Sequence, residues 1–213
     1  MMENEKLVAF TFDDGPVEYA DDSTAMQILR TFEKYGQQAT FFYVGEKMNA
    51  DNKKELDFAQ SIGCEAANHT YSHCFLTKIT LEEVVEEFEK TTRLLEEYTG
   101  KIPVLARIPF MDSNEMVDEA SGFPLIGCSV DSQDYTHNTT EEIIQRIMDA
   151  HETGELENGV VLLHEPYLTT MKAVEYLVPT LIEKGYRFVT VSELAKRNGV
   201  TLQKGKNYAK IEK

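Results

Sequence analysis

Seven short apolar runs, rich in Val, Ile, Phe and Tyr, alternate along the chain with segments of helical period. Short apolar runs bounded by turn residues are typical of strands. The runs predicted to be strands are LVAFTF (7–12), ATFFYVG (39–45), CEAANH (64–69), VLARIPF (104–110), PLIGCSV (124–130), VVLLHE (160–165) and YRFVTV (186–191). We therefore expect a chain in which strand and helix alternate about seven times.

The segments between these runs carry the pattern of amphipathic helices. Met26, Leu29 and Phe32 recur at helical spacing within 25–35, and Gly36 follows as a signal for the end of a helix. This spacing predicts a helix over 25–35.

Two capping boxes mark further helix starts. Thr80 with Glu83, and Thr139 with Glu142, have the S/T-x-x-E spacing in which each side chain bonds the backbone N–H of the other residue. Pro179 lies inside the apolar segment 172–185, where its missing N–H predicts a kink or a restart of the helix.

Regular alternation of strand and helix indicates parallel strands joined by crossover helices, hence a doubly wound sheet or a (β/α) barrel. Unusual polar residues follow the ends of many of the predicted strands, and barrel enzymes build their sites at the carboxyl ends of strands. We expect an α/β fold in one domain over 1–213: a distorted, TIM-like (β/α) barrel of about seven parallel strands. The polar tail, 201–213, is expected as a surface strap or as a partly disordered segment.

Composition narrows the possible partners. The 213 residues are 42% hydrophobic and carry a formal net charge of -16. This charge repels phosphate backbones and anionic lipid, and no Lys/Arg cluster offsets it, which argues against nucleic-acid binding. No apolar run approaches the roughly 20 residues of a membrane span. Three cysteines without C-x-x-C spacing indicate neither a disulfide scaffold nor a zinc knuckle.

The sequence as written begins MMENEKLVAF, which is not an export signal because no basic region precedes an apolar stretch. We therefore expect a cytoplasmic protein. If an upstream segment has been removed, an extracellular or cell-wall location becomes the expectation.

Four residues could form a metal site. His69 and His73 are four residues apart, and on a helical turn both imidazoles can bind one metal ion. Taken alone, this spacing fits two ordinary polar histidines equally well. Asp13 and Asp14 end an apolar run side by side, and a bound cation would relieve their repulsion. One carboxylate could join the histidines as a ligand while the other acts as a general base, although Asp-Gly-Pro also forms ordinary surface turns.

Five strings in order extend this pattern over nearly the whole chain. They are TFDDGP (11–16), HTYSH (69–73), RIPF (107–110), DSQDY (131–135) and LLH (162–164). In order, spacing and chemistry they resemble the motifs of the polysaccharide deacetylase family, the NodB-homology domain. The resemblance implies an enzyme that hydrolyses acetyl groups on carbohydrates.

The resemblance also implies roles for the first three strings. Asp13 would be the general base, while Asp14, His69 and His73 would bind a divalent metal, usually zinc in this family, with cobalt, nickel or manganese as alternatives. Arg107 resembles the arginine that pairs with the catalytic carboxylate and orients it.

The remaining roles concern the substrate and the leaving group. The backbone N–H of Phe110 would stabilise the oxyanion. His164 resembles the general acid, and Asp134 resembles the carboxylate that orients it. Leu162 and Tyr135 would line the pocket for the acetyl methyl group.

Several other polar residues have simpler interpretations. Asp131 is expected to cap the loop before the helix that starts near Thr139. His137 and His151 are left as loop or surface residues.

The chain departs from the family pattern at two positions, with Tyr135 where tryptophan is usual and Met111 where glycine is usual. We predict a metal-dependent N-deacetylase of amino-sugar oligomers or polymers, such as chitin oligomers or peptidoglycan. The alternatives are an O-acetyl (acetylxylan) esterase and a catalytically silent carbohydrate-binding domain.

Overall fold

The computed structural model describes residues 5–212, so residues 1–4 and 213 of the predicted domain lie outside the described part. The strands are β1 (Lys6–Gly15), β2 (Thr40–Tyr43), β3 (Glu65–Asn68), β4 (Leu125–Ile126), β5 (Val130–Asp131), β6 (Val160–His164), β7 (Tyr186–Phe188) and β8 (Asn207–Tyr208). The α-helices are α1 (Thr24–Lys34), α2 (Lys53–Ser61), α3 (Leu81–Thr99), α4 (Glu115–Ser121), α5 (Thr140–Thr153), α6 (Leu168–Glu183) and α7 (Val191–Arg197).

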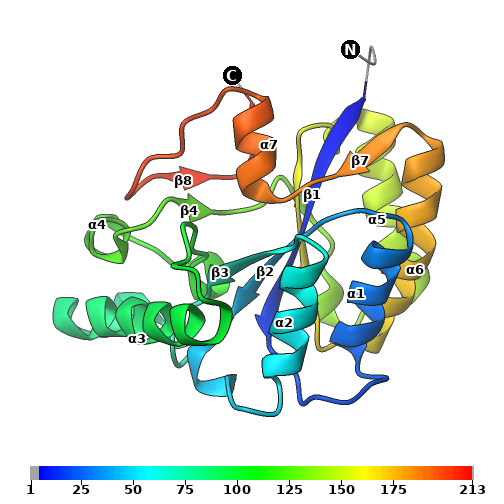
Figure 1. The fold of residues 1–213 in the computed structure, drawn as a ribbon. Helices are drawn as coiled ribbons and strands as arrows, with labels where there is room; N and C mark the ends of the chain where they lie inside the picture. The colour runs from blue at the N-terminus through cyan, green and yellow to red at the C-terminus, as the bar shows by residue number, and fades with distance from the viewer. Residues whose placement is uncertain (1–4, 213) are drawn as a thin grey trace.

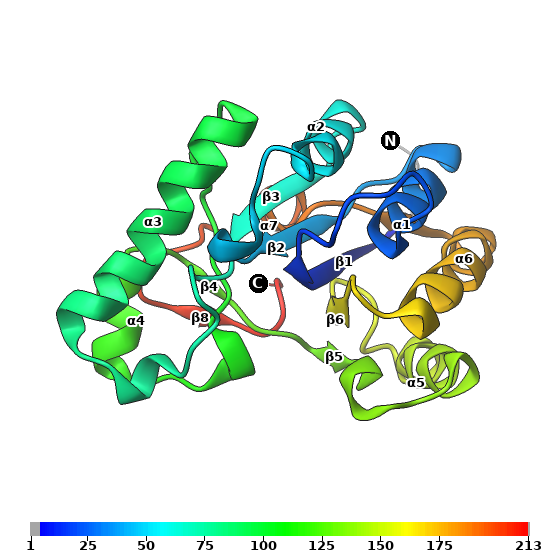
Figure 2. The same ribbon diagram turned by 90° about the horizontal axis from the view of Figure 1, so that it is seen from below.

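Most strands form one parallel sheet around β1. Its order is β3-β2-β1-β6-β5, and β7 pairs with the first residues of β1. A second parallel pair, β4-β8, joins this sheet through Ala106, which bridges both Asn68 and Leu125. The strands thus curve into a distorted barrel with helices on the outside (Figure 1), and Figure 2 looks onto the carboxyl end of β1. The predicted single-domain α/β barrel of parallel strands is confirmed.

The barrel is open on one side. The connection 127–129 joins β4 to β5 without a helix, so this side lacks the outer layer that covers the other strands.

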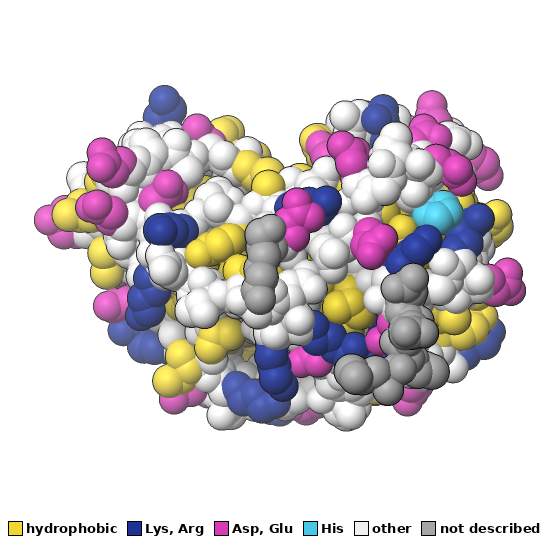
Figure 3. All heavy atoms as spheres, turned by 90° about the horizontal axis from the view of Figure 1, so that it is seen from above, with side chains coloured by type: hydrophobic (Ala, Val, Ile, Leu, Met, Phe, Trp, Pro, Cys, Tyr) yellow, Lys and Arg dark blue, Asp and Glu magenta, His cyan; other side chains and the backbone are white. Residues whose placement is uncertain are grey.

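In the view onto the amino end of β1, the outline of the molecule is notched between two lobes, and side chains of both charges are scattered over this face (Figure 3). The net negative charge is therefore not gathered on this face.

Two predicted strands differ from the structure. The run 124–130 is divided between β4 and β5, which belong to different sheets, and the run 104–110 is not a strand. Within 104–110 only Ala106 forms β-bridges, and the segment ends in a 3₁₀ turn, Pro109–Met111. Pro103 and Pro109 flank the bridging residue and cannot donate ladder hydrogen bonds, and Phe110 has a left-handed backbone (φ 59°). The segment still lies between β3 and β4, where it places Arg107 inside the barrel.

The helix predictions are largely confirmed. Both predicted capping boxes are present, at the starts of α3 and α5, and α1 covers the predicted 25–35 to within one residue. The predicted strand 186–191 is too long. Strand β7 stops at Phe188, because Thr190 caps α7 by accepting a hydrogen bond from the N–H of Glu193. Of the two outcomes expected at Pro179, the restart does not occur: α6 is continuous through this residue, and its buried face packs against α1 and α5.

Among the described residues, no helix is both long and apolar enough to cross a membrane.

The C-terminal segment is more than the expected surface strap. Its residues form β8, and the side chain of Ile211 is completely buried in the core that β1, α7 and β4 share. The amide of Asn198 donates to the carbonyl of Ile211 at 2.6 Å, which fixes this residue against the end of α7. The tail therefore completes the wall of the barrel beside β4.

Aromatic packing fixes the position of β1. Phe12 stacks on Phe41 of β2 (centroids 5.0 Å apart), while Phe10 meets Phe188 of β7 edge to face at 4.8 Å. Phe32 of α1 contacts both clusters from the outer layer. Aromatic pairs of this kind are each worth about 0.5–1.5 kcal/mol beyond their burial. The strand that ends in Asp13 and Asp14 is consequently held from both sides.

Candidate active site

Asp13 and Asp14 lie at the carboxyl end of β1, and both face one cleft. In a regular strand, neighbouring side chains point to opposite faces. Here the register with β2 shifts between Phe12 and Gly15, and Asp14 has a left-handed backbone (φ 70°). The change of direction occurs at Asp14 itself.

The next residue, Gly15, lies so close to the side chain of Glu165 that there is no room for a Cβ atom. A Cβ on Gly15 would lie 2.0 Å from Oε1 of Glu165, the residue after β6. Glu165 and Glu55 of α2 are both fully buried. Burial and the neighbouring carboxyl raise the pKa of Glu165 well above its usual range, and burial also raises the pKa of Glu55. Two neighbouring buried carboxyls with raised pKa values therefore lie beside Gly15.

Asp14, His69 and His73 form a group that fits a metal ion. Their ligand atoms all lie within 4.8 Å of one another, and Nε2 of His73 and of His69 lie 3.1 Å and 3.6 Å from Oδ1 of Asp14. Nδ1 of His69 donates to the carbonyl of Arg107 at 2.8 Å, which leaves Nε2 free to act as a ligand. The Oδ1 atom of Asp14 is buried and has no hydrogen-bond partner among the described residues.

The protonation states of this group suit metal binding. Burial lowers the pKa of His69 and so favours the neutral, ligating imidazole. Burial alone would raise the pKa of Asp14, but the contact with His73 and the charges of His69 and His164 lower it well below its usual range. An acidic oxygen and two imidazoles are the donor set of catalytic zinc and related divalent ions.

The loop that carries the two histidines is held by a carboxylate that the sequence did not reveal. Glu87 of α3 accepts hydrogen bonds from the N–H groups of Tyr71 and Ser72 (2.9 and 2.8 Å) and from the hydroxyl of Ser72 (2.8 Å). These bonds stabilise a loop in which His73 has a positive φ of 56°. No sequence pattern distinguishes Glu87 from the other glutamates of α3.

Arg107 lies behind Asp13 and is only 1% exposed. Its NH1 donates to Oδ1 of Asp13 at 2.7 Å and to the hydroxyl of Thr11 at 2.8 Å. Nε and NH2 donate to the carbonyls of Ile126 and Gly127, both at 2.8 Å. All three guanidinium nitrogens are thus engaged, and Oδ2 of Asp13 is left on the side of His69, 3.6 Å from its Nε2.

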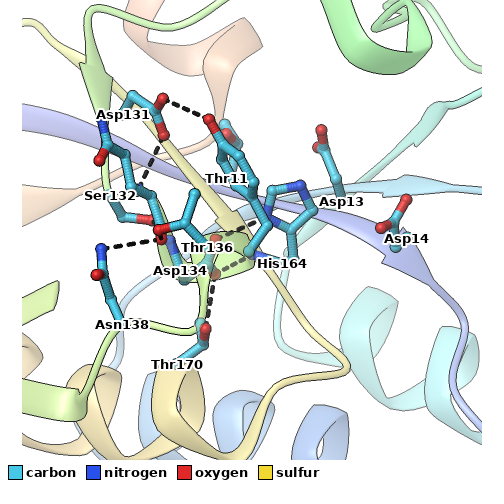
Figure 4. Close-up of polar contacts among 12 residues, drawn as sticks. Thr11, Asp13, Asp14, Asp131, Ser132, Asp134, Thr136, Asn138, His164 and Thr170 are labelled. Atoms are coloured by element: carbon cyan, nitrogen blue, oxygen red, sulfur yellow. Dashed lines mark hydrogen bonds and ion pairs between the residues drawn. The ribbon is translucent and has the colours of Figure 1, made fainter.

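On the opposite side of the cleft, His164 pairs with Asp134 (Figure 4). Nδ1 of His164 lies 2.7 Å from Oδ1 of Asp134, while Oδ2 accepts from the N–H of His164 and from the hydroxyl of Thr170. Burial lowers the pKa of His164, but the bond to Asp134 and the charges of Asp13 and Asp14 raise it, so that the net shift is upward. The imidazolium form is therefore favoured beside the proposed metal site.

The cleft has a volume of about 440 Å³. Leu162 and Tyr135, predicted to line the acetyl pocket, both border it, and so does Phe110. Tyr135 donates its hydroxyl to Asp131, and burial together with this bond raises the pKa of Tyr135 to about 12. Asp131 also accepts from the N–H of Gln133, which agrees with its expected role as a loop cap.

Two further findings concern residues outside the predicted set. Tyr167, which no motif marks, packs edge to face on His164 and lines the cleft. His151 lies on α5 and contacts the hydroxyl of Tyr186, away from the cleft. All ten predicted site residues lie in the cleft or directly behind it.

Comparison with known proteins agrees with this arrangement. A family model described as polysaccharide deacetylase matches residues 2–123, more than half of the chain. The peptidoglycan-N-acetylglucosamine deacetylase of Listeria monocytogenes is 31% identical over 206 residues, which are 95% of this chain and 41% of that protein. The chain thus spans about two fifths of the length of this curated relative.

Two solved structures have nearly the same fold. The Xyl-CE4 domain of a multidomain xylanase from the hindgut metagenome of Trinervitermes trinervoides has a TM-score of 0.88 at 28% identity and covers 98% of both chains. A family 4 acetyl xylan esterase from Clostridium thermocellum, in complex with a cobalt ion, has a TM-score of 0.87 at 26% identity, covering 97% of this chain and 99% of that one.

Proposed function

Because the chain belongs to the polysaccharide deacetylase family, we propose that it is a metal-dependent hydrolase that removes N-acetyl groups from amino-sugar oligomers or polymers. One observation carries the proposal: a three-ligand metal group, an Asp13–Arg107 pair and a His164–Asp134 pair converge on a single cleft. Hydrolysis of an amide needs a base for water, a stabiliser for the oxyanion and an acid for the departing amine, and this cleft offers a candidate for each.

The metal ion would be held by Asp14, His69 and His73, with zinc proposed first and cobalt, nickel and manganese as alternatives. When bound, such an ion polarises a carbonyl oxygen and lowers the pKa of water in its coordination sphere.

Asp13 is the proposed base. Its Oδ1 is fixed by Arg107, and Oδ2 faces the metal group, where it can take a proton from water. Because Arg107 is itself fixed by bonds to two carbonyls and to Thr11, the carboxylate loses little freedom on reaction. The backbone N–H of Phe110 is the proposed donor to the oxyanion.

His164 is the proposed acid. The bond from Nδ1 to Asp134 directs Nε2 away from the aspartate, and the raised pKa keeps a proton available for the leaving nitrogen. An amine leaves poorly without that proton. Overall, one acetamide and one water molecule give acetate and a protonated amino sugar, and the proton that Asp13 takes from water replaces the one that His164 donates.

A second candidate, an O-acetyl esterase acting on xylan, is favoured by the two structural relatives. One is a domain of a xylanase and the other is an acetyl xylan esterase. The same residues could hydrolyse an ester, because an alkoxide leaving group depends less on a proton from the acid than an amine leaving group does.

The deciding experiment is acetate release by protein stripped of metal and reloaded with zinc, cobalt or nickel. N-acetylglucosamine oligomers and acetylxylan are compared, with Asp14→Ala as the test variant and Asp57→Ala, exposed on α2, as its control. We expect metal-dependent acetate from the oligomers that Asp14→Ala abolishes and Asp57→Ala preserves. Release from acetylxylan alone would establish the second candidate, and binding of sugar without acetate at every metal loading would refute both.

A further inference from the structure

Two aromatic rings form an exposed stack at the rim of the cleft. Phe75, in the connection from β3 to α3, and Phe110 stack with centroids 4.1 Å apart and planes 15° from parallel. Although each is packed against the other, Phe75 remains 49% and Phe110 55% exposed. Phe110 also meets the ring of His73 edge to face at 4.7 Å, so the stack continues directly from the metal group.

The backbone holds this stack outward. Phe110 and Met111 both have left-handed backbones, with φ of 59° and 53°. L residues with side chains avoid this region, and they occupy it where the surroundings impose it. Relaxation of either residue would redirect Phe110. The surrounding structure therefore imposes the conformation that presents Phe110 at the rim.

A simpler explanation is that Phe75 merely closes the core below it. The burial pattern argues against this explanation. Leu76, the next residue, is the one that fills the core, at 1% exposure, together with Val84 and Phe88 of α3. Phe75 belongs to none of the buried clusters among the described residues. Its contact with Phe110 leaves half of its surface available to another apolar group.

We propose that Phe75 and Phe110 form a platform for the apolar face of a pyranose ring next to the sugar that is deacetylated. This inference rests on the proposed function. The C–H face of a pyranose packs on an aromatic ring, whereas its hydroxyls stay at the edge in water. The stack itself carries no charge, and a net charge of -16 disfavours a strongly anionic polymer, so the occupant is a neutral glycan.

The platform has a consequence for substrate length. The acetyl group of the reacting sugar lies in the cleft between the metal group and Leu162, while the platform extends from His73 to the rim. Phe75 lies one ring further from His73 than Phe110 does, so its exposed face is left to a second sugar. Phe75 therefore adds to the affinity for a chain in which a second sugar reaches the platform.

The test compares substrates that reach the platform with one that does not. We measure kcat/KM for the N-acetylglucosamine tetrasaccharide and for 4-nitrophenyl acetate in the zinc-loaded wild type, in Phe75→Ala and in Phe75→Trp. Phe75→Ala should lower the ratio of the two kcat/KM values about tenfold, mainly through KM, because about half a ring of apolar contact is lost. Phe75→Trp should keep or raise this ratio. Tyr176→Ala, which removes an equally exposed ring from α6, should leave both values unchanged.

Binding separates this inference from the proposed function. Calorimetric titration of the tetrasaccharide into wild type and Phe75→Ala needs no turnover, and the affinity should fall about tenfold in the variant. Weaker binding in Phe75→Ala would support the platform even if no metal loading yields acetate. Equal affinities, no binding to the wild type, or an equal loss on both kinetic substrates would overturn it.

Discussion

Arg107 offers a strong test of how the fold supports the site. We consider Arg107→Met, which keeps an unbranched side chain but removes the guanidinium. The wild-type group is 1% exposed and donates to Asp13, Thr11 and two backbone carbonyls. In the variant, the carboxylate of Asp13 is left buried without a countercharge.

The expected loss follows from these contacts. Removing one partner of a buried ion pair costs about 3–5 kcal/mol, and each buried acceptor left without a donor adds roughly 1 kcal/mol or more unless water reaches it. A loss of about 4 kcal/mol is therefore a conservative expectation. It is a large share of the roughly 5–15 kcal/mol by which domains are stable.

The measurement is urea unfolding followed by far-UV circular dichroism on metal-free protein at pH 7. With a slope of about 2 kcal/mol/M, the midpoint of Arg107→Met should fall by about 2 M. The double variant Arg107→Met with Asp13→Asn removes the orphaned charge and should recover about 1–3 kcal/mol of the loss. A single variant less than about 1 kcal/mol below wild type, or a double variant no more stable than the single one, would refute the reasoning.

Three further predictions concern groups around the cleft. Asp134→Asn should lower the pKa of His164 and move the basic limb of the pH profile of kcat/KM toward acid, because the bond to Asp134 raises that pKa. Glu87→Gln should weaken zinc binding, measured by calorimetry, about 10- to 100-fold, since its carboxylate orders the ligand loop. Glu165→Gln should raise the free energy of unfolding relative to wild type by more at pH 8 than at pH 5, because the buried carboxyl that it removes has a raised pKa. Burial raises the folded-state pKa of Glu55 and Glu165 above the unfolded value of about 4.3. The folded chain keeps protons that the unfolded chain releases, so wild-type stability is lost as pH rises above that value.

For each of these variants, a control or a specific result would contradict the prediction. Glu86→Gln changes an exposed glutamate on the same helix, which pairs with Lys90, and should leave zinc affinity unchanged. Equal zinc affinity in Glu86→Gln and Glu87→Gln would mean that the loop needs no help from the carboxylate. A pH profile that stays in place in Asp134→Asn would remove His164 from the role of acid. A difference between Glu165→Gln and wild type that does not change between pH 5 and 8 would show that the buried carboxyls do not retain their protons.

Much of the barrel could be predicted because its inner strands are short apolar runs bounded by turn residues, a pattern that is typical of buried strands. A strand is observed at each of the predicted runs 7–12, 39–45 and 160–165, as β1, β2 and β6. The failures occur where a strand is very short or where backbone chemistry competes with hydrophobicity. The pair of residues in β8 is too brief to show a period, and the prolines around Ala106 outweigh the apolar residues between them.

The residues of the site also fall into two groups: those that the sequence identified and those that only the structure reveals. Its ligands and charged pairs belong to compact strings, and these strings identified them. The residues that orient them come from elsewhere in the chain: Glu87 reaches Ser72 from α3, and Thr170 reaches Asp134 from α6. Such partners are fixed only by tertiary packing, so ordinary glutamates and threonines receive their roles from the fold and not from a pattern.

The central position of β1 also affects how the protein is made. Thr11 in β1 bonds Val161 of β6, 150 residues later in the chain, and β7 follows later still. At about 5–20 residues per second, the ribosome needs roughly 8–30 s to reach β6 after it has made β1. During that interval the strand that carries both aspartates has only β2 to pair with, and its phenylalanines are open to other chains. A nascent chain stalled before residue 160 should therefore bind chaperones strongly through 7–12, and release should follow synthesis of β6 and β7.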